Sequence, residues 1–257
     1  MVSAMSAPQW DVRWFDEIDS TNTYLRDQAR SGAPDGLVAV AEFQTAGRGR
    51  LDRRWESPPG SNLLASVLLR PACGADDLHL CSGAVALAAA DACRDAAAVH
   101  AALKWPNDLV VGARKLAGVL AEAEFMGRRL DAVVVGIGVN VAWPGPDEAI
   151  GTCLDELSGA APVDRRVLLD RLLSALFTRR GLLDDAAGRR ALAAEIRSRC
   201  ATIGTDVRVV LAHEELLGRA RAIDDDGALV VETSTGARRI TAGDVVHLRP
   251  APGAGPS

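Results

Sequence analysis

The chain has 257 residues, of which 48% are hydrophobic and 25% are charged, and its formal net charge at pH 7 is -5. This composition is that of a globular protein, and the charge gives no general electrostatic reason to bind nucleic acid. The length suffices for one large domain or for a large domain and a small one.

The basic residues are distributed unusually. Of the 29 basic residues only two are lysines, Lys104 and Lys115, and the other 27 are arginines. A codon bias explains most of this depletion, but it does not explain why both lysines lie so close together. Because an ammonium is a compact point charge whereas a guanidinium is a planar fork, these two positions are candidates for a site that needs lysine.

The cysteines and the apolar segments indicate the compartment. Five cysteines form no C-x-x-C pair, which argues against a disulfide framework or a zinc site and fits a reducing cytoplasm. The N-terminus carries no signal-peptide pattern, and the most apolar stretch, residues 84–98, is interrupted by charges and too short to span a bilayer. We therefore expect a cytoplasmic protein that does not contact a membrane.

The first part of the chain alternates between predicted strands and helices, which indicates an α/β fold with a mixed sheet. Helices are predicted after a cap at Ser20 or Thr21 up to residue 30, and at residues 76–99, 164–180 and 187–200. Strands are predicted at residues 37–42, 62–69, 101–104, 109–111, 116–124 and 132–141. Residues 112–115 between two of these strands suggest a hairpin turn.

After about residue 205 the pattern changes to short strands separated by turns. These strands are expected at residues 207–211, 218–223, 228–232, 237–240 and 245–248. Five short strands in so few residues are typical of a small β-barrel. We expect an α/β domain over residues 10–205, a small all-β domain over residues 206–250, and disordered tails at residues 1–9 and 251–257.

The most unusual segment directly follows the strand predicted at residues 37–42. Glycines and arginines alternate there, in the order Gly47, Arg48, Gly49 and Arg50. Glycine lets the backbone approach a ligand, and arginine binds phosphate or carboxylate oxygens through two hydrogen bonds, so the segment predicts an anion-binding loop. It matches neither the dinucleotide fingerprint nor the P-loop pattern. An exposed basic loop that is merely solvated is an equally acceptable interpretation of this segment alone.

A second segment combines Lys104, Trp105, Pro106, Asn107 and Asp108 at the end of a strand. If the hairpin forms, Lys115 and Asp108 face the same space. A carboxylate there can accept a proton from an incoming amine or help to hold a metal. The alternative is a structural turn beside a surface lysine.

A third segment, residues 136–140, places two glycines within an apolar strand and ends at Asn140. Glycines weaken a strand unless a ligand or another backbone approaches closely, and the amide of Asn140 suits an adenine edge. A closely packed strand explains the segment equally well.

Together and in this order, the segments resemble the biotin protein ligases. The resemblance covers about residues 13–141, with a weaker likeness over 206–249. It rests on Ser20-Thr21-Asn22, Gln44, Gly47-Arg48-Gly49-Arg50 with Arg53 and Trp55, Lys104-Trp105-Pro106-Asn107-Asp108, Arg114-Lys115-Leu116-Ala117-Gly118 and Gly136-Ile137-Gly138-Val139-Asn140. It implies a mixed-sheet catalytic domain related to class II synthetases and an SH3-like C-terminal domain.

The resemblance also implies a two-step reaction. Biotin and MgATP first give biotinyl-5′-adenylate, and a lysine of a biotin carboxyl carrier domain then takes the biotinyl group and releases AMP. Mg²⁺ is expected to come with ATP, because no cluster of side chains suggests a resident metal. The partners are then biotin, ATP and the carrier domain of a biotin-dependent carboxylase, without nucleic acid or membrane.

The resemblance further assigns residues to roles, with Ser20 and Gln44 at the ureido ring of biotin, Lys115 between the biotin carboxylate and the α-phosphate, and Trp55 near the nucleotide. The expected biotin-binding residues are Ser20, Thr21, Asn22, Gln44, Gly47, Arg48, Gly49, Arg50, Lys115 and Gly118. The expected ATP- or adenylate-binding residues are Arg50, Arg53, Trp55, Asn107, Lys115 and Asn140. The expected catalytic residues are Lys115, Arg48, Arg50, Arg53 and Asp108.

One departure and three alternatives remain open. Asp52 stands in the phosphate loop where the family usually has glycine, and we expect it to tighten or reshape the loop by pairing with Arg50 or Arg53. A biotin-responsive repressor is disfavoured, because Ser20 lies so near the start that no helix-turn-helix domain fits before it. A lipoate–protein ligase of the same superfamily is a second alternative, and a nucleotide-binding module without catalysis is a third.

Overall fold

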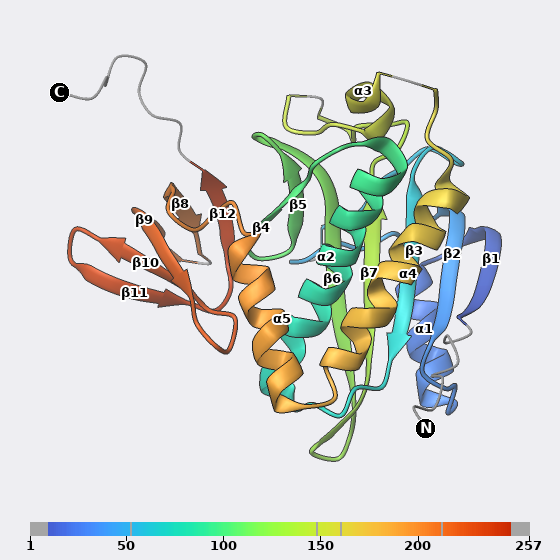
Figure 1. The fold of residues 1–257 in the computed structure, drawn as a ribbon, viewed down its shortest axis with the longest axis horizontal. Helices are drawn as coiled ribbons and strands as arrows, with labels where there is room; N and C mark the ends of the chain where they lie inside the picture. The colour runs from blue at the N-terminus through green and yellow to red at the C-terminus, as the bar shows by residue number, and fades with distance from the viewer. Residues whose placement is uncertain (1–9, 52, 148, 160, 212, 248–257) are drawn as a thin grey trace, which may run out of the picture.

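The computed structural model describes residues 10–247 except for residues 52, 148, 160 and 212. The predictions about Asp52 and about the two terminal tails therefore lie outside the described residues. Figure 1 shows a large α/β part and, at one side of it, a small all-β part that ends the described chain.

A seven-stranded sheet forms the centre of the large part. Its strands lie in the order β1-β2-β3-β7-β6-β5-β4, and only the β1–β2 pair is parallel. The strands are β1 (Asp11–Ile18), β2 (Leu37–Gln44), β3 (Leu63–Leu69), β4 (Ala102–Lys104), β5 (Asp108–Val111), β6 (Arg114–Met126) and β7 (Arg129–Val139). The predicted mixed sheet is thus confirmed.

Helices cover both faces of this sheet (Figure 1). One face packs against α2 (Leu78–Ala97) and α4 (Arg165–Leu182), α5 (Ala186–Ser198) packs against these two helices, and a large apolar core lies between the layers. The other face packs against α1 (Thr21–Arg30), whose Leu25 and Ala29 meet small apolar side chains of the strands. Because α1 covers only part of that face, the sheet leaves room for a site beside its N-terminus.

Sequence features explain the helices on the core face. The many alanines of α2 favour a helix and let it pack closely. At Gly83 an added Cβ would come within 2.2 Å of Ile196 Cδ1, so the glycine allows α5 to approach α2. Asp164 caps α4 by accepting hydrogen bonds from two backbone N–H groups, and Asp185 caps α5 in the same way.

Several predicted boundaries were wrong. The turn between β5 and β6 consists of residues 112–113 rather than 112–115, because Gly112 adopts a positive φ of 60° that permits a tight turn. Strand β1 was missed because its burial is irregular along an edge of the sheet, and charged side chains obscure its alternation. The helix predicted at residues 76–99 is divided into the short helix η1 (Ala75–Asp77) and α2, and the short helix α3 (Leu154–Ser158) was missed.

The small part is a five-stranded antiparallel sheet in the order β11-β10-β9-β8-β12. Its strands are β8 (Asp206–Val210), β9 (Glu215–Ile223), β10 (Leu229–Thr233), β11 (Gly236–Ile240) and β12 (Asp244–His247). The predicted small all-β unit is confirmed. Within the described residues β11 and β12 do not pair, so this sheet is open rather than a closed barrel.

The two parts share an interface. Trp105 packs into the core of the small sheet and donates from Nε1 to Gly227 O at 2.9 Å. Its backbone N–H donates to Thr202 Oγ1 at 3.0 Å. His79 of α2 lies against Gly227. A domain boundary near residue 205 stays a prediction, but these contacts hold the small sheet against α2 and the segment between β4 and β5.

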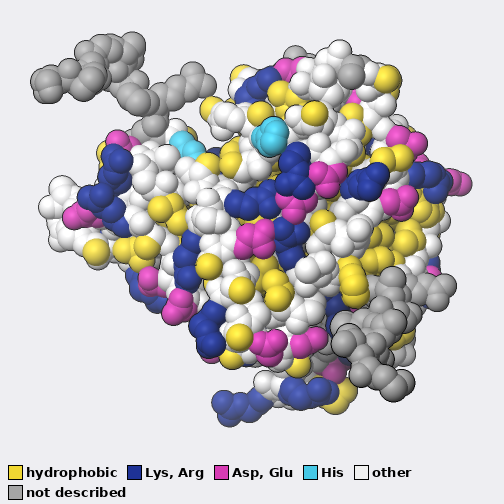
Figure 2. Space-filling model, viewed as in Figure 1, with side chains coloured by type: hydrophobic (Ala, Val, Ile, Leu, Met, Phe, Trp, Pro, Cys, Tyr) yellow, Lys and Arg dark blue, Asp and Glu magenta, His cyan; other side chains and the backbone are white. Residues whose placement is uncertain are grey.

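The surface carries no extended region of one charge on the face shown in Figure 2, where acidic and basic side chains alternate. Among the helices in the described part of the chain, none has the length and hydrophobicity needed to cross a membrane.

Candidate active site

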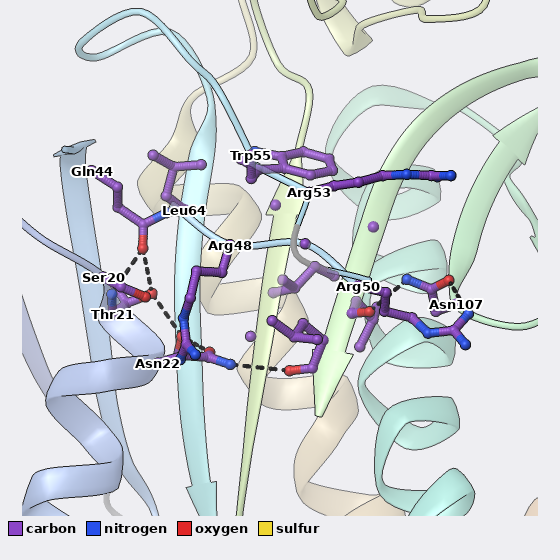
Figure 3. Close-up of a pocket in the computed structure, with 18 of the residues that line it drawn as sticks. Ser20, Thr21, Asn22, Gln44, Arg48, Arg50, Arg53, Trp55, Leu64 and Asn107 are labelled. Atoms are coloured by element: carbon purple, nitrogen blue, oxygen red, sulfur yellow. Dashed lines mark hydrogen bonds between the residues drawn. The ribbon is translucent and has the colours of Figure 1, made fainter. Parts of the chain in front are cut away.

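A cavity of about 140 Å³ lies on the α1 face of the large sheet. The N-terminus of α1, strands β2, β3, β6 and β7 and the loop of residues 45–55 surround it (Figure 3). It is lined by the following predicted residues: Ser20, Thr21, Asn22, Gln44, Arg48, Gly49, Arg50, Arg53, Trp55, Asn107, Asp108, Lys115 and Gly118. The structure thus brings together segments that are nearly one hundred residues apart.

One end of the cavity is neutral and rich in hydrogen bonds. Gln44 Oε1 accepts from the Thr21 backbone N–H at 2.8 Å and lies 3.0 Å from Thr21 Oγ1. Thr21 Oγ1 lies 2.7 Å from Ser66 Oγ, which donates to Asn22 Oδ1 at 2.6 Å. Because Thr21, Asn22 and Ser66 are buried, these hydrogen bonds fix the side chains before any ligand arrives. Ser66 was missed by the sequence reasoning, although a single hydroxyl in the apolar run of β3 is a detectable signal.

Gly136 is required for this arrangement. It faces Ser66 across the β3–β7 pair, and a Cβ built on it would lie 2.2 Å from Asn22 Oδ1. The predicted close approach at this strand is therefore real, and the neighbour that approaches is Asn22.

The loop of residues 45–55 folds back on itself above the cavity. The backbone N–H of Gly49 donates to Arg53 O at 2.7 Å, and that of Trp55 donates to Gly47 O at 3.0 Å. Gly47 does not line the cavity, since a Cβ there would lie 2.4 Å from Trp55 O. Glycine at this position thus serves the loop's own fold, and its contact with the ligand stays a prediction.

Each arginine of the loop has a partner. Arg48 Nη2 lies 2.6 Å from Glu122 Oε2, Arg50 Nη1 donates to Asn107 Oδ1 at 3.3 Å, and Arg53 pairs with Asp244 of β12. Burial lowers the pKa of Arg50, an effect that the nearby carboxylates oppose. Neither Glu122 nor Asp244 was predicted, because their contacts connect segments distant in sequence.

Lys115 and Asp108 face each other across the β5–β6 hairpin. Lys115 Nζ lies 2.7 Å from Asp108 Oδ1, and the two side chains are 37% and 20% exposed. Among the described residues Asp108 Oδ1 has no partner in hydrogen-bonding geometry, so its contact with Lys115 is an ion pair. The ammonium is therefore held at the cavity while still reachable by an anion.

The indole of Trp55 packs directly against two glycines, Gly118 and Gly138. A Cβ on Gly138 would come within 2.3 Å of the indole, and one on Gly118 within 2.8 Å. Lys115 Nζ is 5.4 Å from the centroid of the indole ring. The indole Nε1 is buried and has no hydrogen-bond partner among the residues that the structure describes. A buried donor without a partner is costly, so a ligand acceptor at this point would be favoured.

Asn140 does not line the cavity. It is buried, its Nδ2 donates to Pro144 O at 2.9 Å and to Thr152 O at 3.1 Å, and its Oδ1 accepts from Asn62 at 3.3 Å. In this structure the amide holds the strand-to-loop junction, and its contact with adenine stays a prediction.

Lys104 lines a second, larger cavity of about 310 Å³ between the two parts of the chain. Burial lowers the pKa of Lys104, and the positive charge of Lys115 lowers it further. The two lysines that the composition singles out thus face different spaces, and only Lys115 lines the cavity beneath the loop.

Comparisons with known proteins agree with this fold and site. The model of the Biotin/lipoate A/B protein ligase family matches residues 14–140, and that of the Biotin protein ligase C terminal domain matches residues 202–248. A biotin–[acetyl-CoA-carboxylase] ligase of Mycobacterium tuberculosis is 40% identical over 243 residues, which cover 91% of this chain and 87% of that protein. One of Paracoccus denitrificans is 35% identical over 88% of this chain and 96% of its own length.

Solved structures give the same result. A biotin protein ligase from Aquifex aeolicus, determined in complex with biotin and ATP, matches with a TM-score of 0.77 and 28% identity over 93% of this chain and 99% of that chain. The fold and the site thus define a protein ligase of the biotin/lipoate type. The chain belongs to the biotin protein ligase family.

Proposed function

We propose that this protein activates biotin with ATP as biotinyl-5′-adenylate and transfers the biotinyl group to a lysine of a biotin carboxyl carrier domain. The observation that carries the proposal is the division of one cavity into a neutral, hydrogen-bonded end and a cationic end that contains Lys115. The names of the relatives in M. tuberculosis and P. denitrificans support a carboxylase as the owner of the carrier domain.

The neutral end suits the ureido ring of biotin. Ser20, Thr21, Asn22 and Gln44 supply donors and acceptors without charge, and the network that holds them is already formed. A preformed site loses little conformational entropy on binding. With the ring there, the carboxylate of the biotin side chain would point toward Lys115.

The cationic end suits the first chemical step. A carboxylate oxygen attacks the α-phosphorus of ATP, a new P–O bond forms, and the bond to pyrophosphate breaks. The attack brings two anions together, so the positive charges of Lys115, Arg50 and Arg53 would stabilise the transition state. Asn107, which holds Arg50, and Trp55 would border the nucleotide.

Asp108 suits the second step. The ε-amine of the carrier lysine attacks the acyl carbon, AMP leaves, and the nitrogen loses a proton. Asp108 is next to Lys115 and could accept this proton, directly or through water. The loop of residues 45–55 would meanwhile keep water from the reactive mixed anhydride.

Mg²⁺ would come with ATP rather than occupy a site of its own. In the described part of the chain, no group of three or more His, Cys, Asp or Glu side chains could hold a metal ion. The nearest carboxylates, Asp108 and Asp244, are paired with Lys115 and Arg53. We further propose that the protein acts in the cytoplasm, since its five cysteines are free thiols in this structure.

Transfer of label tests the function. The protein is incubated with MgATP, a biotin carboxyl carrier domain, and either labelled biotin or labelled lipoate. We expect biotin to appear on one carrier lysine and lipoate transfer to be slower by orders of magnitude. Preferred transfer of lipoate would show a lipoate–protein ligase instead. Binding of a specific DNA in a shift assay would favour the biotin-responsive repressor.

A further inference from the structure

The proposed reaction assigns no role to Glu122 of β6, yet this carboxylate contacts a residue of the neutral end of the cavity and a residue of the loop. One of its oxygens, Oε2, accepts from Asn22 Nδ2 at 2.8 Å and from Arg48 Nη2 at 2.6 Å. Its other oxygen accepts from Arg26 Nη1 at 2.9 Å. A single carboxylate therefore holds a residue of the neutral end and a residue of the loop.

These contacts complete a chain of hydrogen bonds. It runs from Gln44 through Thr21, Ser66 and Asn22 to Glu122 and ends at Arg48. Figure 3 shows the part of this chain at Gln44, Thr21 and Asn22. Every member except Arg48 is buried or half-buried, and the Glu122 side chain is only 18% exposed. Arg48 is the point at which the chain reaches the exposed loop.

The two residues that Glu122 holds, Asn22 and Arg48, differ in how many other partners they have. Asn22 is fixed from three sides, by Ser66, by Leu120 O and by Glu122. Arg48 has Glu122 as its only ion-pair partner in the described part of the chain. Loss of the Glu122 charge would therefore release the loop more readily than it would disturb the neutral end, because Asn22 would keep its bonds to Ser66 and Leu120 whereas Arg48 would lose its ion pair.

We propose that Glu122 is a positioning residue that anchors the loop of residues 45–55 over the cavity by holding Arg48 and Asn22 together. The proposal rests on the proposed function, in which this loop covers the adenylate. Because Asn22 is already fixed at the neutral end, Glu122 offers Arg48 a preformed anchor. Glu122 itself touches no substrate.

Glu124 provides a matched control. It lies two residues further along the same strand and face, is 15% exposed, and pairs with Arg26 and Arg30. It contacts neither Asn22 nor Arg48 in the described structure. Glu122→Gln and Glu124→Gln thus remove the same charge from the same α1–β6 contact, and only the first removes the anchor.

The test measures retention of the adenylate and protection of the loop. Each full-length variant forms adenylate from biotin and MgATP, and its release is followed after dilution into unlabelled biotin. Proteinase K digestion of the same samples reports cleavage within residues 45–55. We expect Glu122→Gln to release adenylate about threefold to tenfold faster and to lose loop protection, with Glu124→Gln within about twofold of wild type.

Two further measurements keep the outcomes apart. Arg48→Gln breaks the same pair from the exposed side, and Glu122→Gln should add less than about twofold to it in the double variant. Retention at the wild-type rate by Glu122→Gln, or equal effects of the two glutamate variants, would overturn the anchor. Failure of the wild-type protein to form adenylate would instead overturn the proposed function.

Discussion

The two ends of the cavity are built differently. At the neutral end, buried side chains bind one another through short hydrogen bonds and have no net charge. At the cationic end, Lys115 and Arg53 are partly exposed, and each is paired with a carboxylate of the protein. The neutral end is ready for its ligand, whereas the cationic end must exchange internal carboxylates for the anions of the substrates.

This difference explains how so many positive charges coexist without substrate. Like charges in one small space repel, and carboxylates placed beside them offset that repulsion. Because an exposed ion pair contributes only about 0–1 kcal/mol, a phosphate with several oxygens can displace such a partner at small cost. Mutations at the cationic end should therefore affect chemistry, and mutations at the neutral end should affect biotin binding.

The largest effect is expected for Lys115→Ala. It removes the charge that meets both reacting anions, so adenylate formation should fall roughly a hundredfold or more. Pyrophosphate release in the presence of biotin and ATP measures this step. Lys104→Ala is the control, because it removes the chain's other lysine from the neighbouring cavity and should stay within about threefold of wild type. Equal losses in both variants would remove Lys115 from its special role.

Asp108→Ala should separate the two steps. Without the carboxylate the carrier amine loses its proton acceptor, so transfer should slow by about tenfold or more, while adenylation changes less because Lys115 keeps its charge. Single-turnover transfer from preformed adenylate measures the second step alone. An unchanged transfer rate would exclude Asp108 from it.

Two glycines of one strand should distinguish the two ends. Gly136→Ala pushes against Asn22 and should weaken biotin binding about fivefold to tenfold, whereas Gly138→Ala pushes against Trp55 and should weaken nucleotide binding by a similar factor. Calorimetric titration of each variant with biotin and with an ATP analogue measures both effects. If both variants lose the same ligand, the division of the cavity is incorrect.

The smallest effect concerns the interface between the two parts. Burial lowers the pKa of His79 and of His247, and Lys104 adds to the effect at His247. The unfolded chain therefore takes up protons first as the pH falls, and stability should decline from about pH 6.5 downward. Urea unfolding at pH 7 and pH 5.5 measures the decline, which should be shallower for His79→Gln. An identical decline in that variant would mean that other groups cause it.

The sequence predicted most of the local structure and most of the cavity lining. Glycine and arginine at residues 47–50, and both lysines, were informative because their chemistry is rare in this composition. Strand β1 and the open order of the small sheet could not be predicted, because edge strands lack a clear burial pattern. Glu122, Ser66 and Asp244 were missed because only tertiary contacts bring them to the cavity. The ligand contacts of Asn140 and Gly47 stay predictions, because in this structure the Asn140 amide donates to the protein's own backbone and Gly47 lies against Trp55 O.

The most direct test follows the intermediate itself. Wild-type protein is mixed with biotin and MgATP in the absence of a carrier domain, and the mixture is separated into protein-bound and free fractions. We expect about one equivalent of biotinyl-5′-adenylate to remain with the protein and to react once a carrier domain is added. A protein that binds ATP and biotin but releases no pyrophosphate and holds no adenylate would contradict the account.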